Sequence, residues 1–300
     1  MNTLSAPPSP ATVQAFFDKA THTVSYLVSD PATRAAAIID PVLDFDPKSA
    51  TLSTRSADAL LAAVAAQGLT LNWVLETHAH ADHLSAGALL RERTGAKLVV
   101  GERIVEVQGQ FAPMFEADDV ALDGRQFDRL VSEGDQIALG DLTISVLHTP
   151  GHTPACVSYR IDDMIFVGDT LFMPDYGTAR ADFPGGDAAT LYRSIGKILA
   201  LPPATRVFVG HDYLPPGRDT PAWETTVEAE RASNIHVGGG VSQEAFVAMR
   251  NARDATLDAP VLILPALQVN IRAGALPPAS PGGRVFLKLP VSGPHPTGGG

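Results

Sequence analysis

The sequence has a single cysteine, Cys156, so no disulfide can form within the chain. A metal cluster held only by cysteine thiolates is excluded for the same reason. The chain also lacks any run of about 18 apolar, uncharged residues, and it therefore predicts no transmembrane helix.

Basic residues are scarce, with 22 Lys and Arg against 33 Asp and Glu, and the formal net charge is −11. Because lysine and arginine dominate phosphate binding, this balance argues against a nucleic-acid partner and against an anionic membrane surface. Residues 1–11 lack a basic segment followed by an apolar one, so they do not read as a secretory signal, and we expect a cytoplasmic protein. Apolar residues make up 45% of the chain, which is too apolar for a disordered protein.

Strand and helix patterns alternate along the chain. The predicted strands are 22–29, 35–40, 71–76, 97–100, 142–148, 155–161, 164–167 and 206–209, and the predicted helices are 56–67, 84–94, 187–200, 224–234 and 242–253. The apolar run 261–264 receives no assignment because Pro265 interrupts it. This order predicts an α/β fold of two packed sheets with helices outside. We expect one domain over 12–290, with a helical or irregular C-terminal extension, between flexible tails at 1–11 and 291–300.

Three histidines and one aspartate occupy six positions directly after the predicted strand 71–76: His78, His80, Asp82 and His83. A loop that leaves a strand end can direct several side chains to one point, whereas a strand would divide them between two faces. Imidazole and carboxylate together suit zinc, iron, manganese or copper. The loop therefore predicts a metal site.

Three later residues also follow predicted strands: His152 in HTPGHT, Asp169 in GDT and His211 in GHD. A lone histidine or aspartate at a strand end more often serves as a cap. Together with the first loop, however, they form a set at strand ends, where α/β active sites gather.

Taken in order, these motifs resemble the ligand series of the metallo-β-lactamase superfamily, over residues 13–290. The resemblance implies an αββα sandwich of two mixed β-sheets flanked by helices. Two branches fit, the iron(II) persulfide dioxygenases and glyoxalase II, which is a dinuclear thioesterase.

The two branches imply different metal ligands. In the dioxygenase pattern His78, His152 and Asp169 hold one Fe²⁺ per chain and leave three positions open for substrate, O₂ or water. The remaining candidates then surround the metal, and catalytic roles fall to Asp82, His83 and His211. In the hydrolase pattern two Zn²⁺ ions bind. One is held by His78, His80 and His152, the other by Asp82, His83 and His211, and Asp169 bridges them.

Segments away from the ligands resemble the dioxygenase branch, and in particular a bacterial β-lactamase-like subgroup linked to sulfide handling. They are FMPDYGTARADF at 172–183, GHDY at 210–213, TTVEAERASN at 225–234 and LQVNIRAG at 267–274. The long helical C-terminal domain of glyoxalase II is not evident. Ala181 and Ala273 stand where some relatives carry cysteine, so only Cys156 could supply a thiol, and its strand position favours a buried structural role.

The resemblance implies oxidation of glutathione persulfide, or a related small persulfide, with O₂ to sulfite and thiol, in sulfide detoxification. The alternative is thioester hydrolysis at two metals. A non-enzymatic metal or sulfide sensor would need a broken ligand set, and none of the seven ligands is broken. A homodimer and functional coupling to a sulfurtransferase are further expectations. The candidate substrate-binding residues are Arg180, Tyr213, Arg218, Asn270 and Arg272, since arginine pairs carboxylates through two hydrogen bonds.

Overall fold

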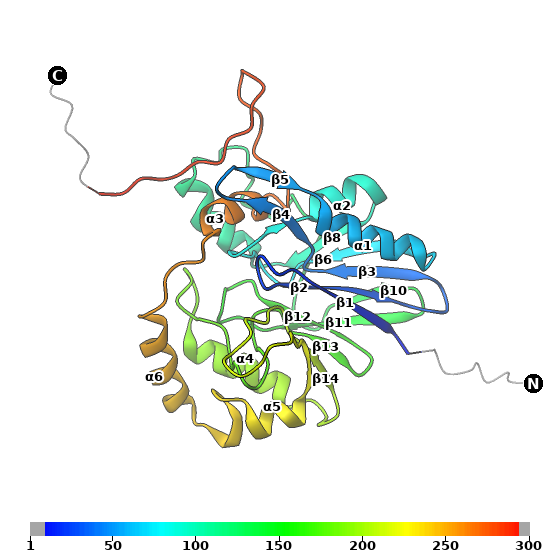
Figure 1. The fold of residues 1–300 in the computed structure, drawn as a ribbon, viewed down its shortest axis with the longest axis vertical. Coiled ribbons are helices and arrows are strands. Elements are labelled where there is room, and N and C mark those ends of the chain that lie inside the picture. The colour runs from blue at the N-terminus through cyan, green and yellow to red at the C-terminus, as the bar shows by residue number, and fades with distance from the viewer. Residues whose placement is uncertain (1–9, 294–300) are drawn as a thin grey trace, which may run out of the picture.

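Two six-stranded β-sheets pack face to face, and helices cover the outer face of each (Figure 1). This arrangement is that of the computed structural model, which describes residues 10–293. The predicted α/β sandwich is confirmed. The outer parts of the two predicted flexible tails, 1–9 and 294–300, lie outside the described residues.

The strands fall into two large sheets and one small one. Across the first sheet the order is β1 (Thr12–Phe17), β2 (Val24–Ser29), β3 (Ala35–Ile39), β6 (Thr70–Leu75), β8 (Lys97–Gly101) and β9 (Arg129–Val131). Across the second it is β10 (Gln136–Leu139), β11 (Leu142–His148), β12 (Val157–Ile161), β13 (Met164–Phe166), β14 (Arg206–Phe208) and β15 (Glu224–Thr226). The small sheet contains β5 (Thr51–Ser53), β4 (Val42–Asp46) and β7 (Leu84–Ser85).

The helices divide between the two outer faces. The first sheet is covered by α1 (Arg55–Ala66), α2 (Gly87–Thr94), α3 (Ile104–Met114) and α7 (Ile263–Asn270), and the second by α4 (Ala188–Leu199), α5 (Val227–Ser233) and α6 (Gln243–Asp254). A single 3₁₀ turn, Gly238–Gly240, follows α5. Of the residues described, none belongs to a helix long and apolar enough to cross a membrane.

The layers arise because side chains along each strand point alternately to the two faces of the sheet. In β3, Ala35, Ala37 and Ile39 face the second sheet, whereas Ala36 and Ile38 pack under the first helical layer. A strand points successive side chains to opposite faces, so a strand covered on both sides is apolar throughout.

Most predicted elements are present, with two boundary corrections. The predicted helix 84–94 begins instead at Gly87, because residues 84–85 pair with β4 as strand β7. The predicted helix 224–234 begins at Val227, because residues 224–226 pair with β14 and Thr226 caps the helix. In both places tertiary pairing overrides local helix propensity.

Several elements were not predicted, namely β1, β4, β5, β9, β10, α3 and α7. The helix α7 runs through Pro265, which lies in its first turn. Proline is tolerated there because the first backbone N–H groups of a helix have no partner within the helix.

Candidate metal centre

The candidate metal ligands come from both sheets. The loop 78–83 follows β6 of the first sheet, whereas His152, Asp169 and His211 follow β11, β13 and β14 of the second. These three strands run in one direction, because β12 is antiparallel to both β11 and β13 and β14 is parallel to β13. Their carboxyl ends therefore meet at one edge of the sheet, and the ligands gather there.

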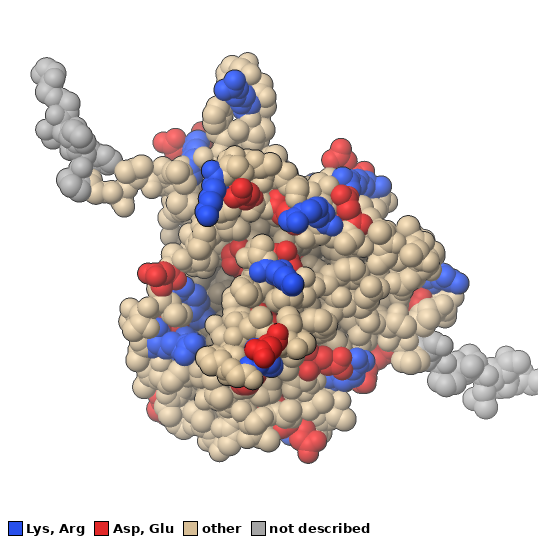
Figure 2. Space-filling view, in the orientation of Figure 1, with Lys and Arg blue, Asp and Glu red and all other residues tan. Residues whose placement is uncertain are grey.

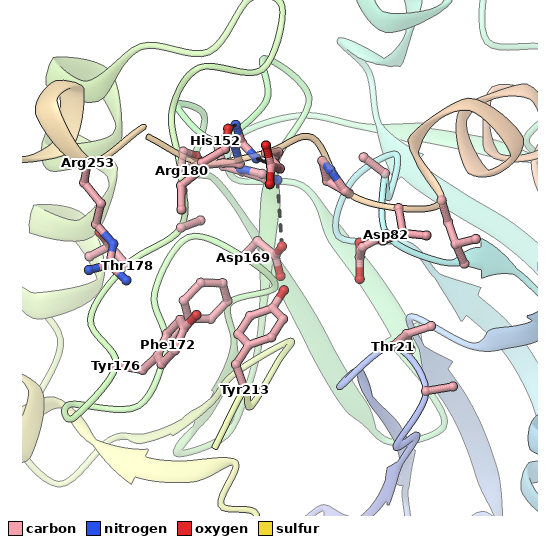
Figure 3. A pocket seen from close by; sticks show the side chains of 18 of the residues that line it. Thr21, Asp82, His152, Asp169, Phe172, Tyr176, Thr178, Arg180, Tyr213 and Arg253 are labelled. Carbon is pink, nitrogen blue, oxygen red and sulfur yellow. Dashed lines mark hydrogen bonds and ion pairs between the residues drawn. The ribbon is translucent and has the colours of Figure 1, made fainter. Parts of the chain in front are cut away.

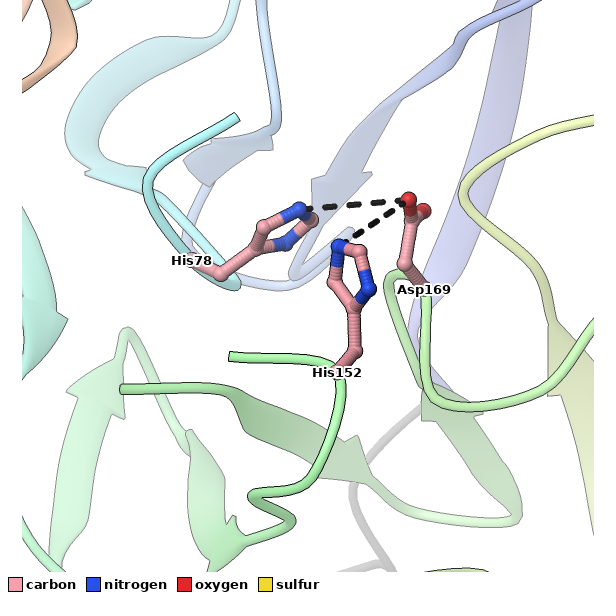
Figure 4. A group of neighbouring side chains, drawn as sticks. All are labelled: His78, His152 and Asp169. Carbon is pink, nitrogen blue, oxygen red and sulfur yellow. Dashed lines mark ion pairs between the residues drawn. The ribbon is translucent and has the colours of Figure 1, made fainter. Parts of the chain in front are cut away.

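His78, His152 and Asp169 form one compact group (Figure 4). The Oδ2 atom of Asp169 lies 3.9 Å from Nε2 of His78 and 3.8 Å from Nε2 of His152. One ligand atom from each of the three lies within 4.8 Å of the others, and all three residues are buried. The arrangement matches the two-histidine, one-carboxylate triad expected from the sequence.

The other four candidates adjoin this group. Nε2 of His211 lies 3.2 Å from Oδ2 of Asp82 and 3.3 Å from Oδ1 of Asp169. His80, Asp82 and His83 form a further group of ligand atoms within 4.8 Å of one another. The structure thus brings all seven predicted ligands together in overlapping groups that share Asp82 and Asp169.

The chemistry of this donor set fits a cation. Burying a polar atom without a partner is costly, and native proteins seldom do so without a reason. Six ligand atoms have no hydrogen-bond partner among residues 10–293: His78 Nε2, His80 Nδ1, Asp82 Oδ2, His83 Nε2, Asp169 Oδ1 and His211 Nε2. Metal coordination would satisfy them.

Hydrogen bonds on the opposite ring nitrogens orient the imidazoles. Nδ1 of His152 donates to the backbone oxygen of Arg180 at 2.8 Å, and Nδ1 of His83 donates to the carbonyl of the following residue at 3.1 Å. Nδ1 of His78 lies 3.0 Å from Oγ1 of Thr77. Each bond fixes the ring and leaves Nε2 available as a ligand, as is usual for metal-binding histidines.

His80 is held by two buried carboxylates. Its Nε2 lies 3.0 Å from Asp40 and 3.3 Å from Glu76. Although burial opposes it, Asp40 and then Glu76 raise the pKa of His80 well above its usual value. Neither acid was expected at the site from the sequence, although each is the last residue of a predicted strand and so lies at the same edge as the ligands.

The protonation state of His78 and His83 suits a metal ligand. Burial, reinforced by neighbouring imidazoles, lowers the pKa of His78 well below its usual range and that of His83 to about 4. Burial raises the pKa of Asp169, which disfavours its charged form, and a bound cation would offset this by stabilising the carboxylate. Both histidines are therefore neutral at pH 7, and the neutral imidazole is the form that binds a metal.

Two glycines allow the close approach of the ligand loops. Gly168 has φ of 51°, and a Cβ there would lie 2.4 Å from Oγ1 of Thr77. A Cβ on Gly210 would lie 2.8 Å from Oδ1 of Asp169. Larger residues at either position would displace a ligand or the residue that orients it.

A cavity of about 500 Å³ opens beside the ligands (Figure 3). Asp82, His152 and Asp169 lie on its wall, so the metal centre is accessible from it. The rest of the wall is mostly aromatic and apolar, and includes Phe45, Phe172, Tyr176, Tyr213, Leu257, Val261 and Leu262.

Among the predicted substrate residues, Tyr213 lines the cavity and packs its ring against a candidate metal ligand. Its ring stacks on that of His211, with centroids 5.4 Å apart, and Figure 3 shows its hydroxyl directed toward Asp169. Burial, followed by the charges of Asp82 and Asp169, raises its pKa well above the usual value. The hydroxyl therefore stays protonated and can donate a hydrogen bond into the cavity.

The three predicted substrate arginines are all bound to aspartates. Arg180 lines the cavity, but its guanidinium pairs with Asp182 at 2.5 Å and donates to a backbone oxygen at 2.7 Å. Arg218 pairs with Asp212 and Asp175 at distances of 2.5–2.8 Å and does not line the cavity.

The two C-terminal candidates also lie away from this cavity. Arg272 is buried, and its guanidinium forms two bonds with Asp119, at 2.6 and 2.7 Å. Asn270 holds the metal loop in place, because its side chain donates to the carbonyls of His80 and His83 and accepts from N–H of Ser85, each at 2.8 Å. Asn270 thus contacts the backbone of two candidate ligands.

The structure also places the cysteine and the two alanines that stand where some relatives carry cysteine. Cys156 is buried, burial raises its thiol pKa to about 12, and it does not line the main cavity. Ala181 lies beside that cavity's wall in a buried segment, whereas Ala273 has φ of 57° and lines a small cavity behind His78 and His80.

Helix α6 contributes residues that the sequence analysis did not identify. Arg250 is buried, pairs with Asp254, and donates to the backbone oxygen of Thr178 at 3.1 Å. Asp254 accepts from N–H of Ala181 at 2.8 Å. Their spacing of four residues across the end of the predicted helix 242–253 was the available signal. Arg253, on the same helix, lines the cavity.

Comparison with known proteins gives matches along most of the chain. The family model described as "Metallo-beta-lactamase superfamily" matches residues 19–211. A Burkholderia pseudomallei (strain 1710b) protein named "Probable metallo-hydrolase" is 54% identical over 291 residues, which cover 93% of this chain and 99% of that protein. A "Beta-lactamase hydrolase-like protein" of Agrobacterium fabrum is 51% identical, but this chain spans only 64% of its length.

Matches to persulfide dioxygenases are more distant in sequence. The human protein named "Persulfide dioxygenase ETHE1, mitochondrial" is 32% identical over 276 residues, or 91% of this chain and 92% of that protein. The crystal structure of ETHE1 from Myxococcus xanthus superposes with a TM-score of 0.71 and 34% identity, covering 88% of this chain and all of that one.

Proposed function

Because the chain belongs to the metallo-β-lactamase superfamily, we propose that it is a persulfide dioxygenase that oxidises glutathione persulfide or a related small persulfide. One observation carries the proposal. A complete two-histidine, one-carboxylate group, His78, His152 and Asp169, opens onto a cavity in a chain that is similar to ETHE1 along about nine-tenths of its length. Iron(II) would be held by these three residues.

The proposed reaction is R–S–SH + O₂ + H₂O → R–SH + SO₃²⁻ + 2H⁺. The S–S bond breaks, the two sulfur atoms together lose four electrons, and O₂ gains four, so no further reductant is needed. When bound, iron(II) would supply open coordination positions and the redox chemistry that activates O₂.

The protein's own residues would position the substrate and handle protons. His211 lies between Asp82 and Asp169, so this trio can move a proton beside the reacting sulfur. Tyr213 offers a protonated hydroxyl to an anionic sulfur or oxygen atom. Phe172 and Tyr176 line the wall and would exclude water around the organic part of the substrate.

The second candidate is thioester hydrolysis at two Zn²⁺ ions. It is supported by the unpaired ligand atoms of His80, His83 and His211, which could hold another metal, and by the hydrolase names of the more similar relatives. Zinc would lower the pKa of a bound water molecule, and this water would then supply the nucleophile.

The two candidates are separated by loading the apoprotein with each metal in turn and assaying both activities. Protein loaded anaerobically with iron(II) should consume O₂ when glutathione persulfide is added, and the same protein loaded with zinc should hydrolyse S-lactoylglutathione only weakly. Rapid thioester hydrolysis without O₂ consumption would support the hydrolase and contradict the dioxygenase.

A further inference from the structure

Three arginines line the cavity, and two of them are already bound. Arg180 pairs with Asp182, and Arg250 pairs with Asp254. Arg253 differs, because its guanidinium has no hydrogen-bond or ion-pair partner within residues 10–293. Arg253 is thus the cavity cation whose charge is free for a ligand.

The position of Arg253 is fixed by its neighbours on α6. Arg250 and Asp254 anchor this helix to the segment 178–181 of the cavity wall, through the backbone of Thr178 and Ala181. Arg253 lies between the two anchors in sequence, and Figure 3 shows it on the same side of the cavity as Thr178. Because the helix is anchored, the backbone of Arg253 is already fixed before a ligand binds. Binding therefore costs less conformational freedom than it would on a mobile segment.

The surroundings favour an anionic group on a small ligand. The cavity wall is otherwise mostly apolar or aromatic. It joins the buried ligands His152 and Asp169 to exposed residues of α6 and of the following segment 255–262, and these exposed residues define its mouth. A ligand whose sulfur lies at His78, His152 and Asp169 would place its organic part toward this mouth. Over the face shown in Figure 2, acidic and basic side chains are interspersed, so no broad basic surface competes with Arg253 there.

From these observations we infer that Arg253 binds a carboxylate on the organic part of the substrate and so favours substrates that carry one there. This inference rests on the proposed function. It assigns to Arg253 the role that the sequence analysis gave to Arg180, Arg218 and Arg272. Arginine suits the role because its planar guanidinium pairs a carboxylate through two hydrogen bonds.

The test uses an unreactive probe, so that binding is measured without turnover. S-methylglutathione carries two carboxylates and no persulfide, and its dimethyl ester has both carboxylates blocked. Dissociation constants for both would be measured by calorimetry on the wild-type holoprotein and on Arg253→Gln. We expect Arg253→Gln to weaken binding of the acid about tenfold, as for one charge-assisted contact at a partly exposed site, and to leave the ester unchanged.

A matched control removes an equal charge elsewhere. Arg125 is exposed, pairs with Asp123 and does not line the cavity, so Arg125→Gln should leave both dissociation constants unchanged. With glutathione persulfide as substrate, Arg253→Gln should raise KM by a similar factor and leave kcat unchanged.

The outcomes test the carboxylate site at Arg253 and the proposed dioxygenase activity separately. Equal affinity of wild type and Arg253→Gln for the acid would overturn it, as would a wild type that binds neither probe or binds both equally. Weaker acid binding by Arg253→Gln in a protein that does not oxidise persulfide would instead retain the carboxylate site and reject the dioxygenase.

Discussion

Nδ1 of His152 donates a hydrogen bond to the backbone oxygen of Arg180, 2.8 Å away, so a residue of the cavity wall orients a candidate metal ligand. The same wall segment is held by the buried pair Arg250–Asp254 on α6. Helix α6 is therefore connected to the metal centre through the backbone of 178–181. This connection makes the helix part of the site.

Asp254→Ala should destabilise the fold and weaken metal binding together. It leaves the buried Arg250 without its partner, which typically costs about 3–5 kcal/mol. Urea unfolding of the apoprotein would measure the loss. Asp258→Ala, an exposed change on the following segment, should stay within about 0.5 kcal/mol of wild type. A cost for Asp254→Ala as small as that of the control would contradict the anchoring role.

Metal content distinguishes one bound ion from two. Asp169→Ala removes a ligand from the triad and should abolish iron binding. His80→Ala should leave one iron per chain in the dioxygenase arrangement but remove a metal in the dinuclear arrangement. Elemental analysis of both variants after anaerobic reconstitution provides the measurement. Full iron content in Asp169→Ala would reject the assignment of Asp169 as a ligand.

Asn270→Ala should loosen the loop that carries His80 and His83. The substitution removes three hydrogen bonds and leaves N–H of Ser85 buried without a partner, at a cost of about 1–3 kcal/mol. Loss of such support around ligands typically lowers metal affinity about 10–100-fold. Metal titration would show this, with the exposed Asn251→Ala as control. Unchanged affinity in Asn270→Ala would show that the loop holds its shape without this side chain.

Glu230 should make stability depend on pH. Burial raises its pKa to about 8, well above the value of a free carboxyl. The native state therefore keeps a proton that the unfolded state has released, and the stabilising contribution present below about pH 4.5 is lost as the pH rises toward 8. Glu230→Gln should remove this dependence, so its stability relative to wild type should rise between pH 5 and pH 8. A difference between the two proteins that does not change with pH would contradict the assignment.

Cys156→Ala should retain persulfide oxidation. The thiol is buried, its pKa is raised to about 12, and it does not line the cavity of the metal centre. It therefore cannot serve as a thiolate at neutral pH. Steady-state kinetics with glutathione persulfide would test this, and loss of kcat in a folded Cys156→Ala protein would require a catalytic thiol.

The sequence predicts the layers, the strands that apolar runs mark and the gathering of the candidate metal ligands, because those signals are local, but it misses strands such as β1, β5 and β9. Apolar runs mark buried strands, and the histidine loop directly follows one of them. The substrate arginines could not be chosen from sequence, since their pairing with Asp182, Asp212 or Asp119 depends on tertiary contacts. Arg253 has no motif of its own, and its role emerges only when α6 is placed against the cavity.

The central claim is tested most directly by the ratio of O₂ consumed to sulfite formed. Iron(II)-loaded protein would be given a limiting amount of glutathione persulfide, with O₂ followed by electrode and sulfite by chromatography. The dioxygenase account predicts one O₂ consumed and one sulfite formed per persulfide, with neither in Asp169→Ala. Sulfite formation without matching O₂ consumption, or no oxidation by protein that holds iron, would contradict it.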